Sequence, residues 1–584
     1  MNRLSSFTKN LKNKPVNLLW LIIILGLVLR TLYPLDRFFS FDQEQIANAA
    51  KQILQKDFTL IGPRTGPAAF HTGPFIYYLG ALIYGLTRLH PIANTFIALA
   101  IYLLTAVFIL KITKKKFSNN FRLVFLTLYS LSPYLISLDR ITWNPNLSFL
   151  SASLIFFGLL GSNLLFVFTG MFFGYQAHFS AFILFAVSLL IIIFLKKSFK
   201  LAISLIAGLF TSLIPLIIFD LRHNWLNLKG LLSLLNNTEQ IGLVDYLGRL
   251  FKNFLITFEN GGKIVFYNLP FVSLILFGLL IFIAWFRTSQ IKTSFKVIVL
   301  AWLFSFPILI SLYRESTPEY YFLMQLPVWI FIFTDVIQRF FKSRGAILFL
   351  IALMTFLSIG IVISHTDKEG LSLKNKLLAL TEIKKQVNNH QVNLVYDMDL
   401  AQQHGWQYLL DYLNLQHNPN LPVKTHLIYP LASKSLRSTF FGSLGIWVDR
   451  RDLYEEASYL NKDSAILFYF PKDWLVQAYL EKDYYPGKSD IKIMKFGSTN
   501  LITDKTNSIY YLYFPKNANQ EYLRLDKIKK TDDKKWNLTS LNHENLEQPN
   551  TYYYSDRSMT HVFIFPQSYS SEDIFNFFNK TETL

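Results

Sequence analysis

Long apolar runs follow one another through the first 365 residues and give way to much shorter ones afterwards. Several of the early runs exceed the roughly 18 residues that indicate a membrane span, and only short polar breaks separate them. From residue 366 a charged helical pattern (KEGLSLKNKLLALTEIKKQVNN) leads into short runs rich in β-branched and aromatic residues, such as VNLVYD and THVFIF. These runs are typical of strands. The pattern predicts a polytopic α-helical membrane domain over residues 1–365 and a soluble α+β or mainly β domain over residues 366–584.

The apolar runs of the membrane domain predict eleven spans. Residues 145–195 should hold three of them, because about 50 helical residues would extend roughly 75 Å, far beyond one bilayer. Breaks are expected near Gly161-Ser162-Asn163 and near Tyr175–His178. The short stretch 73–89 contains glycine and proline and is expected to be a re-entrant or interfacial helix. The other eight spans are expected at 16–35, 91–110, 120–137, 201–219, 264–286, 297–313, 319–338 and 345–365.

The charge of the chain indicates its topology. Basic residues outnumber acidic ones by 57 to 38, a formal net charge of +19. Five segments without any acidic residue hold 18 of the basic ones: 1–14, 111–122, 196–200, 287–296 and 339–344. Such segments mark cytoplasmic loops, so the excess charge indicates no nucleic-acid partner. The prediction is a multi-pass protein of the plasma (inner) membrane, with a cytoplasmic N-terminus and an extracytoplasmic soluble domain. The chain has no cysteine, which excludes disulfides and thiolate chemistry.

With this topology, nearly every polar motif of the membrane domain falls on the outer side, whereas the predicted cytoplasmic loops hold little besides Lys, Arg, Ser and Asn. Residues distant in sequence would therefore meet at one face, as in a membrane-embedded active site. The motifs are FDQE (41–44), RTG and AFHTGP within 64–74, LDRITWNPN (138–146), YQAH (175–178), FDLRHN (219–224) and YRESTPEYY (313–321).

The order of these motifs resembles a known family. An acidic motif follows the first span, then an amphipathic stretch (IANAAKQILQ), then HTGPFIYY. This is similar to the GT-C fold glycosyltransferases of the family 39-like group, which includes protein O-mannosyltransferases and lipid A aminoarabinose transferases. That group carries an Asp-Glu pair followed by (H/K)PPLYY. Asp42 matches the acidic position, His71 takes the His/Lys position, and Gly73-Pro74 replaces Pro-Pro. RITWNPNL, FDLRHN and EYYFLMQLP also look like bacterial members, so the resemblance covers about residues 15–365.

Two departures affect the carboxylates. The adjacent Asp-Glu of the family is Asp-Gln-Glu here, which leaves Glu44 as a second candidate beside Asp42. The family's second acidic position could correspond to Asp139. The candidate catalytic residues are therefore Asp42, Glu44 and Asp139.

The resemblance implies transfer of a sugar from a polyprenyl-phosphate-linked donor to an acceptor hydroxyl at the outer face, with inversion. Asp42 would act as general base on the acceptor. The acceptor would be a protein, a lipid or a polysaccharide. Cationic groups would stabilise the departing phosphate; the candidates are Arg64, His71, Arg140, Arg222 and Arg314. Candidates for holding the sugar or its surroundings are Tyr77, Trp143, Asn144, His178 and Tyr320.

Each candidate also has a structural interpretation. Asp42 and Glu44 could cap a helix that begins near residue 43. Asp139 and Arg140 could form a local ion pair, and Trp143 fits an interfacial aromatic belt. His71 could be an interfacial residue and His178 an interhelical hydrogen-bonding residue. Arg222 and Arg314 could anchor span ends.

A divalent metal ion is a candidate cofactor, since Asp, Glu and His are expected on the outer face, although no motif such as HExxH is present. Two other functions stay open. A transporter or flippase of lipid-linked glycans should show internal repeats and ionisable residues near the bilayer centre. A non-catalytic scaffold would tolerate the loss of Asp42.

Overall fold

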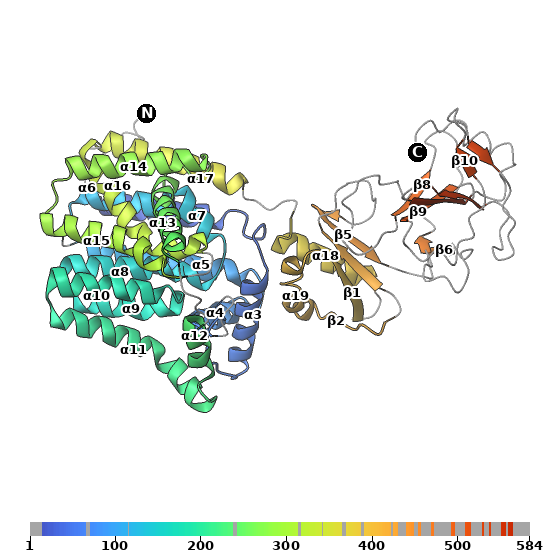
Figure 1. Ribbon diagram of the computed structural model, residues 1–584, viewed down its shortest axis with the longest axis horizontal. Coiled ribbons are helices and arrows are strands. Elements are labelled where there is room, and N and C mark those ends of the chain that lie inside the picture. The colour runs from blue at the N-terminus through green and yellow to red at the C-terminus, as the bar shows by residue number, and fades with distance from the viewer. Residues whose placement is uncertain are drawn as a thin grey trace, which may run out of the picture. The chain divides into compact units, whose positions relative to one another are not determined.

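The computed structural model of the chain is shown in Figure 1. It describes residues 15–65, 70–114, 116–236, 242–313, 317–340, 343–364, 370–386, 391–421, 424–429 and 440–448, and beyond residue 448 only the strands. The chain divides into two compact units, Met1–Asp367 and Lys368–Leu584.

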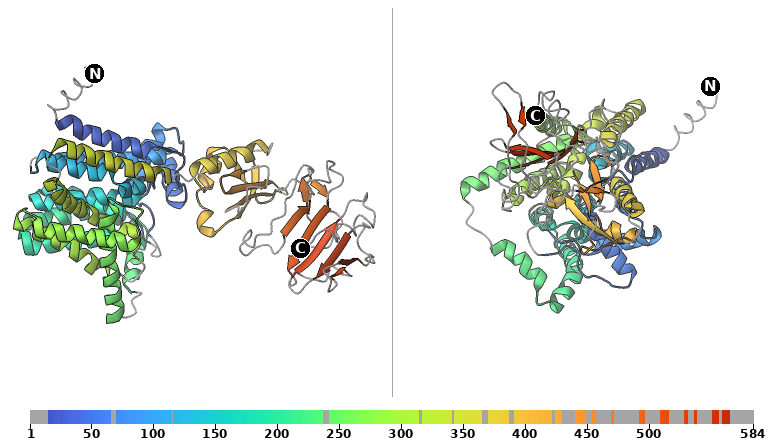
Figure 2. Two further views of the ribbon diagram at one scale, coloured as in Figure 1. Left: turned by 90° about the horizontal axis from the view of Figure 1, so that it is seen from above. Right: turned by 90° about the vertical axis from the view of Figure 1, so that its right-hand side faces the viewer.

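The first unit is a helical bundle, and the polytopic fold predicted from the apolar runs is confirmed. Within its described part, seven helices are long and apolar enough to cross a membrane, or eight when a bent pair is counted as one span. Three of the shorter apolar helices, α2, α9 and α10, coincide with the remaining predicted spans. The helices are α2 (Pro15–Thr31), α5 (Ala93–Thr113), α6 (Asn119–Leu131), α7 (Pro133–Asp139), α8 (Leu147–Gly161), α9 (Leu164–Ala177), α10 (Ala181–Leu190), α11 (Phe199–Arg222), α14 (Phe271–Thr288), α15 (Thr293–Ile310), α16 (Leu326–Phe340) and α17 (Arg344–Ser364). Figure 2 shows α2 beside α6 and α17.

Local sequence sets where these helices begin and end. The side chains of Ser118, Ser132, Asn163 and Ser198 each accept a hydrogen bond from a backbone N–H in the first turn of the helix that follows, which is the usual role of an N-cap residue. Ser162 adopts the left-handed conformation at the end of α8, with φ of 51°. The predicted breaks in residues 145–195 are therefore real, and the segment folds as three consecutive helices.

Two predicted spans differ from the structure. The span expected at 120–137 is broken, and its halves α6 and α7 meet at 49°. Pro133 lacks an N–H and forces Ser132 out of the helical region, which explains the bend. The span expected at 264–286 begins later, at Phe271, because Pro270 precedes its first turn.

Two short helices, α3 (Phe41–Leu54) and α4 (Phe75–Leu86), precede the long helix α5 in the chain. Helix α3 buries Ile46, Ala50 and Ile53 and packs against α4. Helix α4 has 12 residues, a rise of about 18 Å that is too short to cross a bilayer. It occupies the stretch expected to be re-entrant or interfacial.

Sequence patterning missed α12 (Leu226–Asn236) and α13 (Leu243–Lys263). Helix α13 buries polar residues such as Asn253 and Thr257 and exposes apolar ones such as Val244 and Phe251. This arrangement reverses the pattern of a helix on a soluble protein, because its outer face is suited to lipid rather than to water.

The second unit is α+β, as expected. Helices α18 (Leu373–Gln386) and α19 (Gln407–Tyr412) accompany a five-stranded sheet with the order β2-β1-β3-β5-β4. Strand β1 pairs in parallel with β2 and β3, and the remaining pairs are antiparallel. These strands are β1 (Gln391–Asp397), β2 (Gln416–His417), β3 (Lys424–Ile428), β4 (Phe440–Phe441) and β5 (Leu444–Val448). A second, antiparallel sheet has the order β12-β13-β9-β8 and is formed by Thr551–Ser555, Met559–Ile564, Ile509–Pro515 and Lys492–Phe496.

Candidate functional site

Hydrogen bonds and ring contacts join the polar motifs at one end of the bundle. Gln43 Nε2 donates to the carbonyl of Thr142 at 2.7 Å, and Asn144 Nδ2 donates to the carbonyl of Ala177. Tyr175 Oη donates to the carbonyl of His71 at 3.3 Å. The ring of Trp143 contacts that of Tyr320, with 4.8 Å between centroids. Motifs that lie far apart in the chain therefore share one region.

Asp42 is at the start of α3 and is half-buried. Burial raises the pKa of its carboxyl group above the ordinary value of 3.8. The carboxylate is close enough to the hydroxyl groups of Tyr77 and Tyr320 to interact with both electrostatically. The backbone N–H of Ser40 at the start of α3 is bound by the side chain of Gln43, at 3.0 Å. The first turn of α3 thus uses Gln43 rather than Asp42 for this bond.

Aromatic rings pack against Tyr320, one of the two tyrosines near Asp42. His178 packs against Tyr320 and Tyr321, with ring centroids 5.3 and 4.6 Å away. The buried indole N–H of Trp143 has no hydrogen-bond partner among the described residues. An unpaired buried donor is costly and rare. Because its ring contacts Tyr320, this N–H is available to a ligand that binds against that tyrosine.

His178 sits in the short turn between α9 and α10. Its Nδ1 accepts the backbone N–H of Ser180 at 3.2 Å, so the neutral ring carries its proton on Nε2. Burial lowers the pKa of His178 to about 3. The imidazole is therefore uncharged at neutral pH and can donate but does not bring a positive charge.

The loop that precedes α4 holds Arg64 and His71 next to each other, joined by a β-bridge. His71 Nδ1 lies 2.9 Å from the carbonyl of Gly62, so it donates and leaves Nε2 as an acceptor. Burial lowers the pKa of His71. The loop is fixed from outside by Asn227 Oδ1, which accepts the backbone N–H of His71 at 2.5 Å. Arg64 is exposed and is the charged member of the pair.

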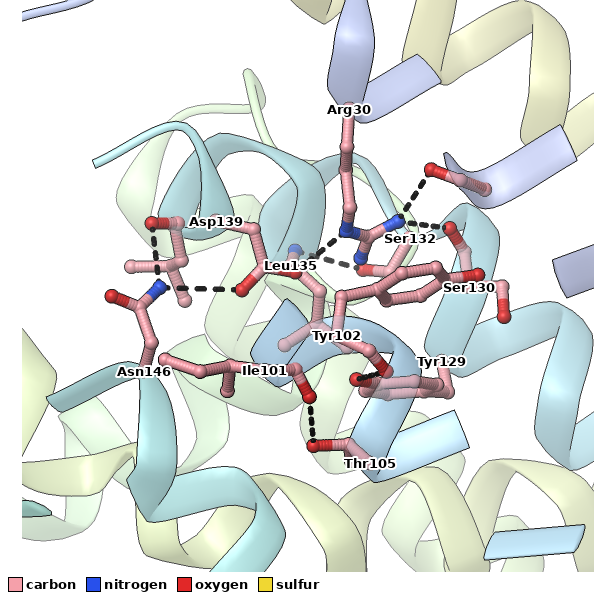
Figure 3. A network of polar contacts seen from close by, with 12 residues as sticks. Arg30, Ile101, Tyr102, Thr105, Tyr129, Ser130, Ser132, Leu135, Asp139 and Asn146 are labelled. Atoms are coloured by element: carbon pink, nitrogen blue, oxygen red, sulfur yellow. Dashed lines mark hydrogen bonds and ion pairs between the residues drawn. The ribbon is translucent and has the colours of Figure 1, made fainter. Parts of the chain in front are cut away.

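Asp139 belongs to a separate buried network, shown in Figure 3. Arg30 Nε donates to its carboxylate at 2.6 Å, and Asn146 Nδ2 donates to the other oxygen at 3.3 Å. Arg30 also donates to the carbonyls of Gly26 and Ser130 and lies over the ring of Tyr102, 4.1 Å from its centroid. This network joins α2 to α5, α6 and α7.

The two arginines next to this network donate hydrogen bonds to backbone carbonyls. Arg140 Nη1 donates to the carbonyl of Leu32 at 2.8 Å. Arg37 donates to the carbonyls of Asp139 and Arg30. Burial and the neighbouring charge of Arg140 lower the pKa of Arg37 to about 9. The expected ion pair between Asp139 and Arg140 is therefore replaced by one between Asp139 and Arg30.

The predicted residues thus fall into distinct groups. Asp42, Tyr77, Trp143, Asn144, His178 and Tyr320 come together, with Glu44 half-buried two positions after Asp42 on α3. Arg222 is exposed at the end of α11. Arg314 lies outside the described residues. The functional roles of all these residues stay predictions.

The solved structures that resemble this chain include ArnT from Cupriavidus metallidurans bound to undecaprenyl phosphate, with a TM-score of 0.50, and ArnT from the same organism in the apo state, with a TM-score of 0.51. Each shares 10% sequence identity and covers 74% of this chain and 97% of ArnT. The chain has a GT-C-like fold. The expectation drawn from the motif order is confirmed at the level of the fold. No protein-family model and no curated protein matches the sequence.

Several residues that support the site in this GT-C-like fold were not predicted. Arg30 lies inside an apolar run, and a lone arginine there is the signal that could have revealed the buried network. Lys263, at the end of α13, joins this helix to the 3₁₀ segment Glu319–Gln325 through a bond of 3.0 Å to Glu319, and it also pairs with Glu259 of its own helix at 2.8 Å. Tyr320, the residue after Glu319, is thereby held from a second side.

The described residues contain no group of three or more His, Asp or Glu side chains placed to hold a metal ion. The side chains near Asp42 are instead the phenols of Tyr77 and Tyr320, which are poor ligands for a hard divalent cation.

Proposed function

We propose that the protein transfers a sugar from a polyprenyl-phosphate-linked donor to an acceptor hydroxyl at the end of the bundle that holds Asp42. The observation that carries the proposal is the setting of Asp42. A half-buried carboxylate of raised pKa lies near two tyrosines, and one of these, Tyr320, contacts a tryptophan whose N–H is unpaired. The likeness to ArnT, which was solved with undecaprenyl phosphate, supports a polyprenyl-phosphate lipid as the carrier.

In the proposed reaction the acceptor oxygen attacks the anomeric carbon of the donor. The bond between that carbon and the phosphate oxygen breaks with inversion, and the electron pair leaves with the phosphate. Asp42 takes the acceptor proton. A raised pKa makes its ionised form a stronger base, while the aromatic surroundings limit its contact with water. Trp143 donates its N–H to a sugar hydroxyl or to a phosphate oxygen.

The departing phosphate carries negative charge that needs a partner. Arg64 is the candidate cation in the loop before α4, because the lowered pKa of its neighbour His71 makes that imidazole neutral. The Nε2 of His71 would then accept a hydrogen bond from a sugar or acceptor hydroxyl. We assign Asp139 a positioning role, because Arg30 and Asn146 already use its oxygens.

We further propose the topology expected from the basic segments, with the N-terminus in the cytoplasm and the Asp42 group at the outer face. This arrangement suits a lipid-linked donor, which needs no nucleotide outside the cell. The proposed reaction does not require a metal ion. Turnover that survives chelation by EDTA would agree with this, and turnover that is lost and then restored by Mg²⁺ or Mn²⁺ would contradict it.

The deciding experiment compares membranes that contain wild type, Asp42→Asn and the control Asp57→Asn, whose carboxylate is exposed. Radiolabelled polyprenyl-phosphate sugars and a cell-envelope extract are supplied, and sugar leaving the lipid is followed. We expect wild type and the control to turn over and Asp42→Asn to lose at least about 100-fold. The rate should rise with pH along an acidic limb above pH 3.8, because ionised Asp42 is the active form. Full activity in Asp42→Asn would exclude the base role and direct attention to Glu44.

The competing function is a transporter or flippase of lipid-linked glycans. The buried Arg30–Asp139 pair is an ionisable element inside the bundle, as such a protein would need. A flippase would move the labelled lipid across vesicles without releasing sugar from it. Movement without release in wild type would favour that function over the transferase.

A further inference from the structure

Three helices that start at the Asp42 end of the bundle finish together at its other end. Helix α5 begins beside Gln43, to whose carbonyl Asn94 donates, and ends at Thr113. Helix α8 begins after Asn144 and ends at Gly161. Helix α10 begins after His178 and continues as the π-helix Ile191–Lys196. In Figure 1, α8, α9 and α10 lie in the same part of the unit, and α9 packs against both α8 and α10.

Two lysines, Lys116 from the turn after α5 and Lys196 from the end of the π-helix, meet at this far end. Lys116 Nζ lies over Gly161, where an added Cβ would collide with it. Lys196 Nζ lies 3.5 Å from the Oγ of Ser162, the residue that follows Gly161. The two ammonium groups are close enough to repel each other. Neither forms an ion pair with a carboxylate of the described part of the chain.

The backbone is unusual at the same place. A π-helix is rare and often occurs at functional sites, and here it ends at Lys196. The turns that follow α8 and this π-helix each contain a non-glycine residue in the left-handed conformation, Ser162 with φ of 51° and Lys197 with φ of 49°. Such residues are strained and are kept where the surrounding structure requires them.

Exposed apolar side chains lie close in sequence to Ser162 and Lys196. Leu165, Phe194 and Phe199 are 67%, 67% and 80% exposed. In a membrane protein such residues face acyl chains. Two repelling ammonium groups and a hydroxyl therefore lie next to a lipid-facing surface. An anion bound there would neutralise their charge.

We propose that Lys116, Lys196 and Ser162 bind the phosphate of an anionic phospholipid whose acyl chains lie against Leu165, Phe194 and Phe199. A phosphodiester has two free oxygens, enough for both ammonium groups, and the hydroxyl can donate to one of them. Basic pockets between membrane helices on the cytoplasmic side bind such headgroups. The site lies at the opposite end of the bundle from the proposed sugar transfer and is independent of it.

The test measures lipid binding and requires no activity. Purified protein in detergent is titrated with phosphatidylglycerol or with phosphatidylcholine of the same chains, and bound lipid is counted by native mass spectrometry. We expect one tightly held phosphatidylglycerol. The variant Lys116→Gln/Lys196→Gln should bind it about 30-fold more weakly. The matched control Arg287→Gln/Lys292→Gln removes the same charge from the exposed α14–α15 turn and should bind as wild type does.

Each alternative gives a different result. Equal binding of both lipids, or equal losses in the two variants, would overturn the site in favour of diffuse surface charge. Inorganic phosphate in excess should leave the lipid bound; displacement by it would show a site for free phosphate and refute the lipid assignment. If the double variant does not fold, Lys196→Gln alone should weaken binding about five-fold, and unchanged affinity in that variant would overturn the proposal.

Discussion

Removing the charge of Asp139 should destabilise the protein more than removing Arg30. Arg30 is fully buried, whereas the side chain of Asp139 is 16% exposed. Asp139→Asn leaves a buried guanidinium without its counter-ion, which costs about 3–5 kcal/mol. Arg30→Met leaves a carboxylate that water can reach and that Asn146 still binds, so the cost should be nearer about 2–3 kcal/mol, the value of a charged hydrogen bond with its partner removed. The double variant should cost less than the two together by about 2 kcal/mol.

Equilibrium unfolding in mixed detergent–SDS micelles measures these differences at fixed lipid content. Asp57→Asn and Lys252→Met, both at exposed positions, control for the loss of one charge and should change the free energy of unfolding by less than about 0.5 kcal/mol. Additive effects, or costs as small as those of the controls, would refute the structural role of the pair. Loss of sugar transfer in Asp139→Asn at unchanged stability would instead indicate that Asp139 acts in catalysis.

Two further results are expected. Because burial lowers the pKa of His178 from 6.5 to about 3, the unfolded chain binds more protons between these values, so stability should be complete above pH 6.5 and fall as the pH drops toward 3. Thermal unfolding from pH 7 to pH 4 should show this slope in wild type, and a His178→Gln variant with the same slope would contradict the cause. Lys263→Met should raise KM for the donor several-fold with a smaller change in kcat, because it frees Glu319 next to Tyr320. The exposed-site variant Lys252→Met should leave KM unchanged, and equal effects of the two variants would show that the bridge does not position the site.

The periodicity of apolar residues was sufficient to predict the bundle, since a bilayer demands long uninterrupted runs. The breaks within residues 145–195 were predictable because Gly161-Ser162-Asn163 combines a flexible residue with a helix cap. Helix α13 was missed because its lipid-facing residues and its buried polar residues do not form the stripe expected of a soluble helix. The bend at Pro133 was missed because residues 123–137 are apolar apart from a few hydroxyl groups, and hydropathy does not register a lost backbone donor.

Motif order placed Asp42 near Trp143 and Tyr320 in one candidate site, but it could not show which charges pair. The partner of Asp139 is Arg30, far away in sequence, rather than its neighbour Arg140. The same holds for Lys263, whose bridge to Glu319 depends on how α13 packs. Short-range sequence carries no information on such pairs.

The spacing of the Asp42 group along the chain has a consequence for synthesis. Asp42 lies on the first surface helix to be made, while Tyr320 follows nearly all the spans of the bundle. A nascent chain that has inserted everything up to α15 still lacks Tyr320 and its neighbour Glu319, which Lys263 binds. Under the proposed function, the growing protein is therefore inert during its passage into the membrane. Activity begins only when almost the entire bundle has assembled, so that partly inserted or truncated chains cannot consume the lipid-linked donor.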